Sequence, residues 1–283
     1  MLYNTLVNSI DWRFMLMKKK KQTMPIPPIA VIIGVVFLVM VLIFALGGSD
    51  KKESQREVQI GIAYLESLER KDPGPVQQVR KEIRQRQLAE ERDQLLVKLE
   101  SGEIDPFSMF KDYVLMGDSR AVGFWYRDFL DKGRVLADGG HTIRNITEQM
   151  DTLVSLNPAT IYLCYGLNDC SIGYWDTAES YVTEYMQIVA KIREQLPDAT
   201  IVVSSILPAK DPAFKKSAKW RDIPQWSAAL EQACKDNNVP FANCDALAEE
   251  HAKLWDPDGI HFREDFYPYW ASNLVVATLT EGA

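Results

Sequence analysis

The stretch Tyr-Val-Leu-Met-Gly-Asp-Ser, residues 113–119, decides the fold of the chain. Four apolar or aromatic residues lead directly into glycine, aspartate and serine, which is typical of a buried strand that ends in a turn. Similar apolar runs lie near 134–138, 160–164, 200–205 and 239–243. Amphipathic stretches alternate with them near 121–131, 144–155, 177–195, 223–237 and 265–280. This alternation predicts an α/β fold in which crossover helices join the strands of a central parallel sheet of about five strands.

The composition is that of a globular protein, because 47% of the 283 residues are hydrophobic and 25% are charged. Disorder, collagen-like repeats and a disulfide scaffold are therefore excluded. The net charge of −7 is unevenly distributed, since residues 1–49 carry Arg13 and Lys18–Lys21 against Asp11, a net +4. The rest of the chain carries −11. So acidic a segment excludes nucleic acid as a partner, because proteins bind nucleic acid by neutralising its phosphates with basic residues.

Ile29–Leu46 contains no polar side chain and is long enough to cross most of a bilayer core. We expect a transmembrane anchor at 29–47, with the basic segment 1–28 on the cytoplasmic side and the remainder outside the cell membrane. A cleaved signal peptide ending near Ala45-Leu46-Gly47 is the alternative, although the apolar core exceeds the usual ~7–15 residues. Met17, which precedes four lysines, is the expected native start.

Residues 48–108 are rich in charged, helix-favouring residues and predict a helical stalk. Two helices, near 53–70 and 76–100, are expected on either side of a turn at Asp72–Pro75. The second has a thin apolar stripe, formed by Val79, Ile83, Leu88, Leu95, Leu96 and Leu99. A solvated stalk packed lightly against the main domain, 109–283, is favoured. A coiled coil or a helix that docks a partner is the alternative, although no heptad pattern is sustained.

Polar and glycine-rich blocks follow three of the predicted strands and precede the last helix. They are Gly-Asp-Ser (117–119), Gly-Gly-His-Thr (139–142), Gly-Leu-Asn-Asp (166–169) and Asp-Gly-Ile-His (258–261). Ligands of such sheets bind at the carboxyl ends of the strands, where the first three blocks lie. Together they supply a hydroxyl, an imidazole, a carboxylate and amide donors, which are the parts of an acyl-transfer site.

Each part has a chemical reason. The hydroxyl of Ser119 is a weak nucleophile that needs a base, and His261 is the candidate. Asp258, three residues before His261, can fold back to orient the ring and stabilise the imidazolium that forms. The tetrahedral intermediate needs donors for its oxyanion. Three are available: the backbone amides of Ser119 and Gly140 and the side-chain amide of Asn168.

In this order the four blocks resemble the SGNH hydrolase family, also called GDSL esterases and lipases, over about Tyr113 to Trp270. The resemblance implies a three-layer α/β/α flavodoxin-like sandwich and a serine acyl-enzyme, without metal or cofactor. It also implies that Ser119 is the nucleophile, that Gly140 and Asn168 complete the oxyanion hole, and that Asp258 and His261 complete a catalytic triad.

Two positions depart from the expected pattern. Gly139 could replace Gly140 as the oxyanion donor, because two glycines stand together. Arg120 follows the nucleophile, where a small or aliphatic residue would be more usual. One hypothesis places Arg120 at the pocket mouth, favouring substrates that carry a carboxylate or phosphate. The alternative is an ion pair with an acidic neighbour such as Asp128.

Other side chains have weaker claims on the site. Among the aromatic residues, which are mostly expected in the core, Tyr174 and Trp175 directly follow the Asn168 block and are candidates for a pocket wall. His141 either contacts substrate or is a bystander in its turn, and His251 is expected on the surface. Asp118 and Asp169 are expected to accept backbone hydrogen bonds that hold their loops.

The four cysteines, Cys164, Cys170, Cys234 and Cys244, show no spacing that indicates zinc. We expect free thiols, with Cys164–Cys170 and Cys234–Cys244 as the alternative bridges.

The sequence thus predicts an extracytoplasmic serine esterase that hydrolyses a short-chain or O-acetyl ester, such as one on cell-surface carbohydrate. One alternative is an O-acyltransferase that uses the same residues on cell-surface glycans. Another is a non-catalytic, membrane-anchored scaffold whose stalk binds a partner.

Overall fold

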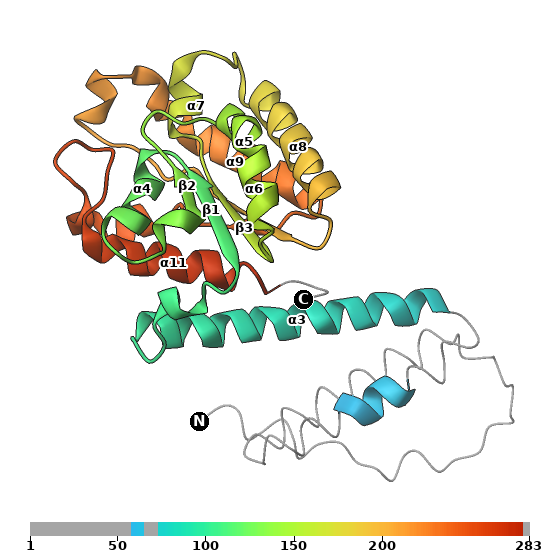
Figure 1. Ribbon diagram of the computed structural model, residues 1–283. Helices are drawn as coiled ribbons and strands as arrows, with labels where there is room; N and C mark the ends of the chain where they lie inside the picture. Colours follow the sequence, from blue (N-terminus) through green and yellow to red (C-terminus); the bar gives the residue numbers. More distant parts are fainter. Residues whose placement is uncertain (1–57, 65–72, 280–283) are drawn as a thin grey trace, which may run out of the picture. The chain divides into compact units, whose positions relative to one another are not determined.

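The computed structural model describes residues 58–64 and 73–279 (Figure 1). The predicted membrane segment at 29–47 and most of the predicted helix at 53–70 lie outside the described residues. The chain divides into two units, residues 1–82 and 83–283. Residues 58–64 are helical, within the stretch predicted to be the first stalk helix.

A five-stranded parallel sheet forms the centre of the second unit, as the sequence predicts. Its strands are β1 (Tyr113–Gly117), β2 (Val135–Ala137), β3 (Thr160–Cys164), β4 (Thr200–Ser204) and β5 (Phe241–Ala242), in the spatial order β2-β1-β3-β4-β5. β1 pairs along its whole length with β3, from Tyr113 opposite Thr160 to Gly117 opposite Cys164. All five residues of β1 are buried, because helices cover both faces of the sheet.

The described helices are α3 (Pro73–Glu100), α4 (Ser119–Tyr126), α5 (Arg144–Glu148), α6 (Met150–Leu156), α7 (Leu167–Ile172), α8 (Ala178–Gln195), α9 (Ile223–Asp236), α10 (Leu247–Glu250) and α11 (Tyr267–Val276). Short 3-10 helices lie at Pro106–Met109, Lys132–Arg134, Ala213–Lys215, Ala218–Asp222, Ala252–Leu254 and Glu264–Phe266.

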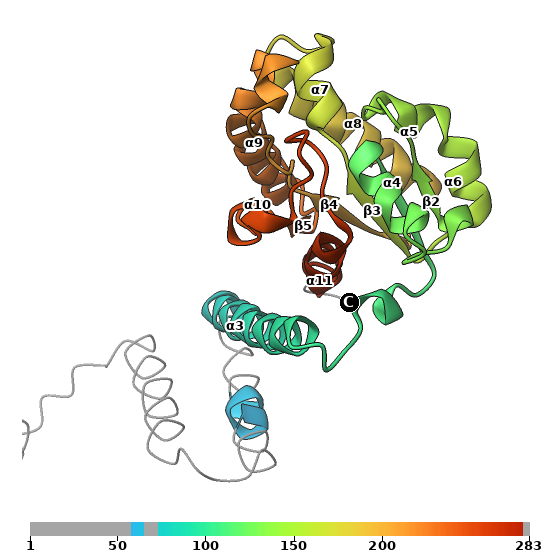
Figure 2. The same cartoon turned by 90° about the vertical axis from the view of Figure 1, so that its left-hand side faces the viewer.

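The alternating side chains of β1 show how the layers form. Val114 and Met116 belong to one buried cluster with side chains from α5 to α9, whereas Leu115 belongs to a second cluster with α4, α10 and α11. Figure 2 shows α11 and α9 on different sides of the strands. The sheet is therefore the middle of three layers, and its strand order is that of flavodoxin-like folds.

Several helix bounds differ from the prediction. The helix expected at 121–131 begins two residues earlier, at Ser119, and ends at Tyr126. The helix expected at 144–155 is two helices that meet at Gln149. α7 was not predicted, because it is short and lies between glycines. Both glycines have positive φ, +130° at Gly166 and +86° at Gly173, so the backbone bends sharply at each end.

α3 also differs from the prediction, because it includes the prolines of the expected turn at Asp72–Pro75. Proline is tolerated in the first turn of a helix, where its missing N–H would have no partner. Near the carboxyl end of α3, Leu99 is 4% exposed and belongs to the cluster that contains α11. The Arg92 guanidinium donates to the carbonyl of Leu279 (Nε to O, 2.9 Å).

In residues 58–64 and 73–279 no helix combines the length and hydrophobicity needed to span a bilayer.

Candidate active site

The candidate nucleophile lies where β1 turns into α4. The carboxylate of Asp118 caps α4 by accepting a hydrogen bond from the backbone N–H of Arg120 (2.9 Å). Asp118 and Arg120 are buried, whereas Ser119 between them is partly exposed. As the first residue of an eight-residue helix, Ser119 has a backbone N–H without an intrahelical partner. Its hydroxyl and its N–H are therefore both at the positive end of the helix dipole.

His261 is presented by a tight loop before α11. An antiparallel bridge pairs Trp255 with Phe262, and the N–H of Asp256 donates to the carbonyl of His261 (2.9 Å). The N–H of Gly259 donates to Asp256 (3.2 Å) and closes the turn. The loop thus brings residues 256 and 261 together and holds the imidazole in place.

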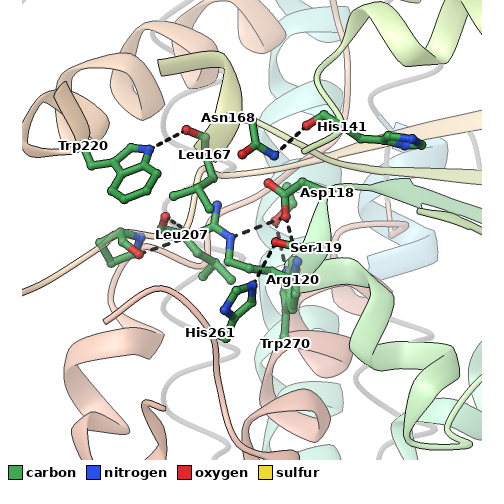
Figure 3. A network of polar contacts seen from close by, with 12 residues as sticks. Asp118, Ser119, Arg120, His141, Leu167, Asn168, Leu207, Trp220, His261 and Trp270 are labelled. Carbon is green, nitrogen blue, oxygen red and sulfur yellow. Dashed lines mark hydrogen bonds and ion pairs between the residues drawn. The ribbon is translucent and has the colours of Figure 1, made fainter. Parts of the chain in front are cut away.

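The structure brings the three predicted triad residues together. The Oγ of Ser119 lies 2.9 Å from Nε2 of His261, and the two side chains point toward each other in Figure 3. Nδ1 of His261 lies 2.6 Å from Oδ2 of Asp258. The other carboxylate oxygen of Asp258 accepts the backbone N–H groups of Ile260 and His261, both at 2.9 Å. These bonds are what the three-residue spacing predicts.

The ionisation of Asp258 determines which imidazole nitrogen carries the proton. Burial alone would raise the pKa of Asp258, but hydrogen bonds from the backbone and ring of His261 and from Ile260 outweigh it and lower the pKa to about 2. Asp258 is therefore a carboxylate at neutral pH and can only accept. Nδ1 of His261 must donate to it, which leaves Nε2 of the neutral ring free to accept the proton of Ser119.

The loop after β2 presents Gly140 and settles which glycine can donate. The N–H of Gly139 donates to the carboxylate of Asp138 (2.7 Å). The N–H of Gly140 has no hydrogen-bond acceptor among the described residues, and Gly140 is exposed. Gly140, not Gly139, therefore has the free donor that an oxyanion hole requires.

Asn168, in the first turn of α7, links α7 to the loop after β2 that carries Gly140. Its Nδ2 donates to the carbonyl of His141 (2.9 Å), beside Gly140 (Figure 3). Since a side-chain amide has two N–H bonds, the second is available to a ligand. On the other side, the indole N–H of Trp220 donates to the carbonyl of Leu167 (2.8 Å) and holds the start of α7.

The neighbouring Asp169 makes a second link. It is fully buried, and its Oδ1 accepts the N–H of Ile143 (2.9 Å), as expected for a residue that holds a loop. Burial, reinforced by the nearby carboxylate of Asp118, raises the pKa of Asp169 to about 7 despite that hydrogen bond. The hydrogen bond that Asn168 donates and the one that Asp169 accepts thus join the loop after β2 to the first turn of α7.

The hypothesis that Arg120 lies at the pocket mouth is wrong. Its side chain is 3% exposed, and it donates to the carbonyl of Leu207 (2.6 Å) and lies 3.6 Å from the carboxylate of Asp118. The alternative, an ion pair with an acidic neighbour, is correct in kind, but the partner is Asp118 and not Asp128. α4 begins at Ser119 and directs the next side chain inward, which explains the difference.

Trp175 is not an open wall of the site. It is 5% exposed, and its indole N–H donates to the carboxylate of Glu184 (2.8 Å). Tyr174 is 52% exposed, and the guanidinium of Arg144 lies 4.7 Å from the centre of its ring. Arg144 also pairs with Glu184 (2.8 Å), so one acidic residue supports both aromatic side chains. Of the two, only Tyr174 presents its ring to solvent.

The remaining histidines lie outside the triad. The ring of His141 points away from Ser119 in Figure 3, and the contact that His141 makes in the site is through its backbone carbonyl. The ring of His251 stacks on Tyr269, with ring centres 3.6 Å apart.

All four cysteines are buried free thiols, as expected. Burial raises the pKa of Cys234 and of Cys244 to about 12, and burial also raises the pKa values of Cys164 and Cys170.

Sequence reasoning missed two supporting residues. Trp220 and Tyr267 are two of the aromatic residues that were mostly expected in the core, yet both donate to backbone atoms of the site, to Leu167 (2.8 Å) and to Arg120 (2.9 Å) respectively. Neither pairing has a signal in the sequence, because each joins residues more than 50 positions apart.

A three-layer α/β fold that holds a serine, a histidine and an aspartate in hydrogen-bonding distance defines a serine hydrolase of the α/β class. Comparison with known families places the chain more closely. The model of the GDSL-like lipase/acylhydrolase family matches residues 115–267, more than half of the chain, so the chain belongs to this family. It is therefore a serine hydrolase that acts on ester bonds.

Several solved structures are similar to this chain. One, described as a GDSL-like lipase from Parabacteroides merdae, is 18% identical, with a TM-score of 0.50 over 60% of this chain and 97% of that chain. Another, described as a GDSL-like lipase from Bacteroides thetaiotaomicron, is 17% identical, with a TM-score of 0.49 over 59% and 86% of the two chains. A search of curated proteins finds no match.

Proposed function

We propose that this chain is an extracytoplasmic esterase that hydrolyses short-chain or O-acetyl esters through an acyl-enzyme on Ser119. The observation that carries the proposal is the chain of contacts from Ser119 Oγ to His261 Nε2 (2.9 Å) and from His261 Nδ1 to Asp258 (2.6 Å). Each partner faces the atom that its role requires, and each is partly exposed and so open to a ligand.

In the acylation step His261 takes the proton of Ser119 while Oγ attacks the ester carbonyl carbon. The negative charge that develops on the carbonyl oxygen is stabilised by the N–H groups of Ser119 and Gly140 and the amide of Asn168. The imidazolium is stabilised by the ionised Asp258. It then gives its proton to the departing alcohol, and the acyl group stays on Oγ.

Deacylation repeats these steps with water. His261 removes a proton from a water molecule while the water oxygen attacks the acyl carbon. The N–H groups of Ser119 and Gly140 and the amide of Asn168 again stabilise the oxyanion. The proton returns from His261 to Oγ of Ser119 when the acid leaves. An acyltransferase would differ only in using a sugar hydroxyl in place of water.

The proposed location follows from the charge pattern. Ile29–Leu46 is apolar and follows the basic segment that contains Lys18–Lys21, a pattern that favours a single-pass anchor with residues 48–283 outside. Fractionation with protease protection tests this proposal. We expect the full chain in the membrane fraction and residues 48–283 cleaved only by external protease; recovery in the wash without detergent would contradict it.

The substrate class is supported by this location and by the acyl-hydrolase family. An external site meets acylated carbohydrate, and the exposed ring of Tyr174 could stack on a sugar face. The cell-surface ester is therefore a proposal, as is the alternative in which a helix of the stalk docks a partner.

The experiment compares p-nitrophenyl acetate, butyrate and octanoate as substrates of the full chain in detergent. We expect kcat/KM to fall as the acyl chain lengthens, and Ser119→Ala to abolish turnover of all three. An octanoate preference would contradict the short-chain proposal. Incubation of an acetylated sugar with an acceptor sugar separates the alternatives, because a hydrolase releases free acetate and a transferase yields acetylated acceptor.

A further inference from the structure

The guanidinium of Arg120 joins the nucleophile turn to the loop after β4. Its Nη1 donates to the carbonyls of Leu207 (2.6 Å) and Pro208 (3.4 Å), and its Nε lies 3.6 Å from the carboxylate of Asp118. Figure 3 shows the side chain extending from beside Ser119 toward Leu207. A planar guanidinium can make these contacts together, because its N–H groups point in fixed, divergent directions.

The same loop also holds the turn that carries the base. The N–H of Lys210 donates to the carbonyl of Gly259 (3.0 Å), between Asp258 and His261. Gly259 has φ +72°, and a Cβ there would collide with the carbonyl oxygen of Lys210, so only glycine permits this approach. The segment 207–210 therefore contacts the nucleophile side at one end and the base side at the other.

Other bonds keep Arg120 in place. The hydroxyl of Tyr267 in α11 donates to its carbonyl (2.9 Å), and its own N–H donates to Asp118 (2.9 Å). With the side chain 3% exposed, Arg120 is held by backbone and side chain at once. A buried charge is costly unless it is paired and hydrogen-bonded. The guanidinium of Arg120 has two carbonyls and one carboxylate as partners.

We propose that Arg120 is a positioning residue, which sets the separation between Ser119 and His261 through the segment 207–210. This inference rests on the proposed function, in which the proton of Ser119 passes to His261 across that separation. The polar contacts of the Arg120 side chain are with Leu207, Pro208 and Asp118, so its effect passes through Asp118 and Ser119 on one side, and through Lys210 and Gly259 on the other.

The test measures kcat and KM for p-nitrophenyl acetate, and the rate at which a fluorophosphonate labels Ser119, in Arg120→Met and Arg120→Lys. Misplacing a reacting group by about 1 Å can cost about 100-fold in rate. We expect kcat and the labelling rate of Arg120→Met to fall about 10- to 100-fold, with KM within twofold. Arg120→Lys keeps the positive charge but loses the planar arrangement of N–H donors, so its losses in kcat and labelling rate should be smaller, about 10-fold.

Arg193→Met is the matched control. Arg193 donates to two successive backbone carbonyls, Asn237 (3.1 Å) and Asn238 (2.9 Å), near the carboxyl ends of α8 and α9. It should keep parental kcat and labelling rate. Circular dichroism and melting curves identify any variant that fails to fold, and if Arg120→Met does so, Arg120→Lys decides by the same criteria.

The proposal is overturned if a folded Arg120 variant keeps kcat and labelling rate within twofold of the parent, or if its loss lies in KM. Failure of the parent itself to label at Ser119 would instead refute the proposed function, so the two failures are distinguishable.

Discussion

At the scale of single residues, the site depends on which backbone N–H groups are already hydrogen-bonded within the protein. Gly139 and Gly140 are equivalent in the sequence, yet the N–H of Gly139 is bound to Asp138 and that of Gly140 is free. Ser119, Asp258 and His261 could be predicted, because Ser119 follows the end of a strand and a three-residue spacing joins Asp258 to His261. The burial of Arg120 could not, because its partner Leu207 is 87 positions away.

Replacing Asp258 by Asn tests the orientation of the base. The Asn oxygen can still accept the N–H groups of Ile260 and His261, so the turn should persist, but its amide favours the wrong tautomer of the ring. A comparable change in another serine hydrolase lowers kcat about 10⁴-fold. We expect a loss of about 10³- to 10⁴-fold in kcat and a melting temperature within a few degrees of the parent. A kcat within tenfold of the parent would argue against the role of Asp258.

Asn168→Ala tests the third oxyanion donor. Removing one such donor costs about 10²- to 10³-fold in kcat, and we expect that loss with little change in KM. Asn237→Ala is a suitable control, because the amide of Asn237 also donates to a backbone carbonyl, that of Ala233 (2.8 Å), but at the end of α9. Equal kcat in the two variants would exclude Asn168 from the oxyanion hole.

At the scale of elements, the sequence predicted each strand and the order of strands and helices, because both depend on local hydrophobic periodicity. It missed α7, a six-residue helix between two glycines, since so short an element has no periodicity to detect. Yet α7 carries Asn168 and Asp169, whose hydrogen bonds to the loop after β2 align the donors of the site.

Asp169 should make stability depend on pH. Its folded pKa of about 7 lies above the ordinary value of about 3.9 for an unfolded chain, so the native state binds a proton more tightly than the unfolded state. Its contribution to the free energy of unfolding is complete below about pH 4 and is lost as pH rises through about 7. Urea unfolding at pH 5 and pH 8 measures this loss, which should shrink in Asp169→Asn. Equal pH dependence in variant and parent would show that Asp169 is not the group responsible.

At the scale of the whole molecule, the net charge of −7 conceals +4 in residues 1–49 and −11 in the rest of the chain. This asymmetry supports the proposed orientation. The described part supplies the catalytic fold, whose three layers follow from local patterns, whereas the contacts that align its loops depend on packing between distant segments.

The four buried thiols give a test of the whole fold. Because Cys164, Cys170, Cys234 and Cys244 are buried and their pKa values are raised, an aromatic disulfide reagent should react slowly with the native protein. In denaturant without reductant, four thiols per chain should react quickly. Two or none would indicate bridges that the structure does not contain.

The most direct test of the central claim is fluorophosphonate labelling of the full chain in detergent, followed by peptide mapping. We predict one covalent adduct, on Ser119. Ser119→Ala should not label and should lose ester hydrolysis. An unlabelled parent that still hydrolyses p-nitrophenyl acetate, or an adduct on another residue with Ser119→Ala fully active, would contradict the claim that Ser119 forms the acyl-enzyme.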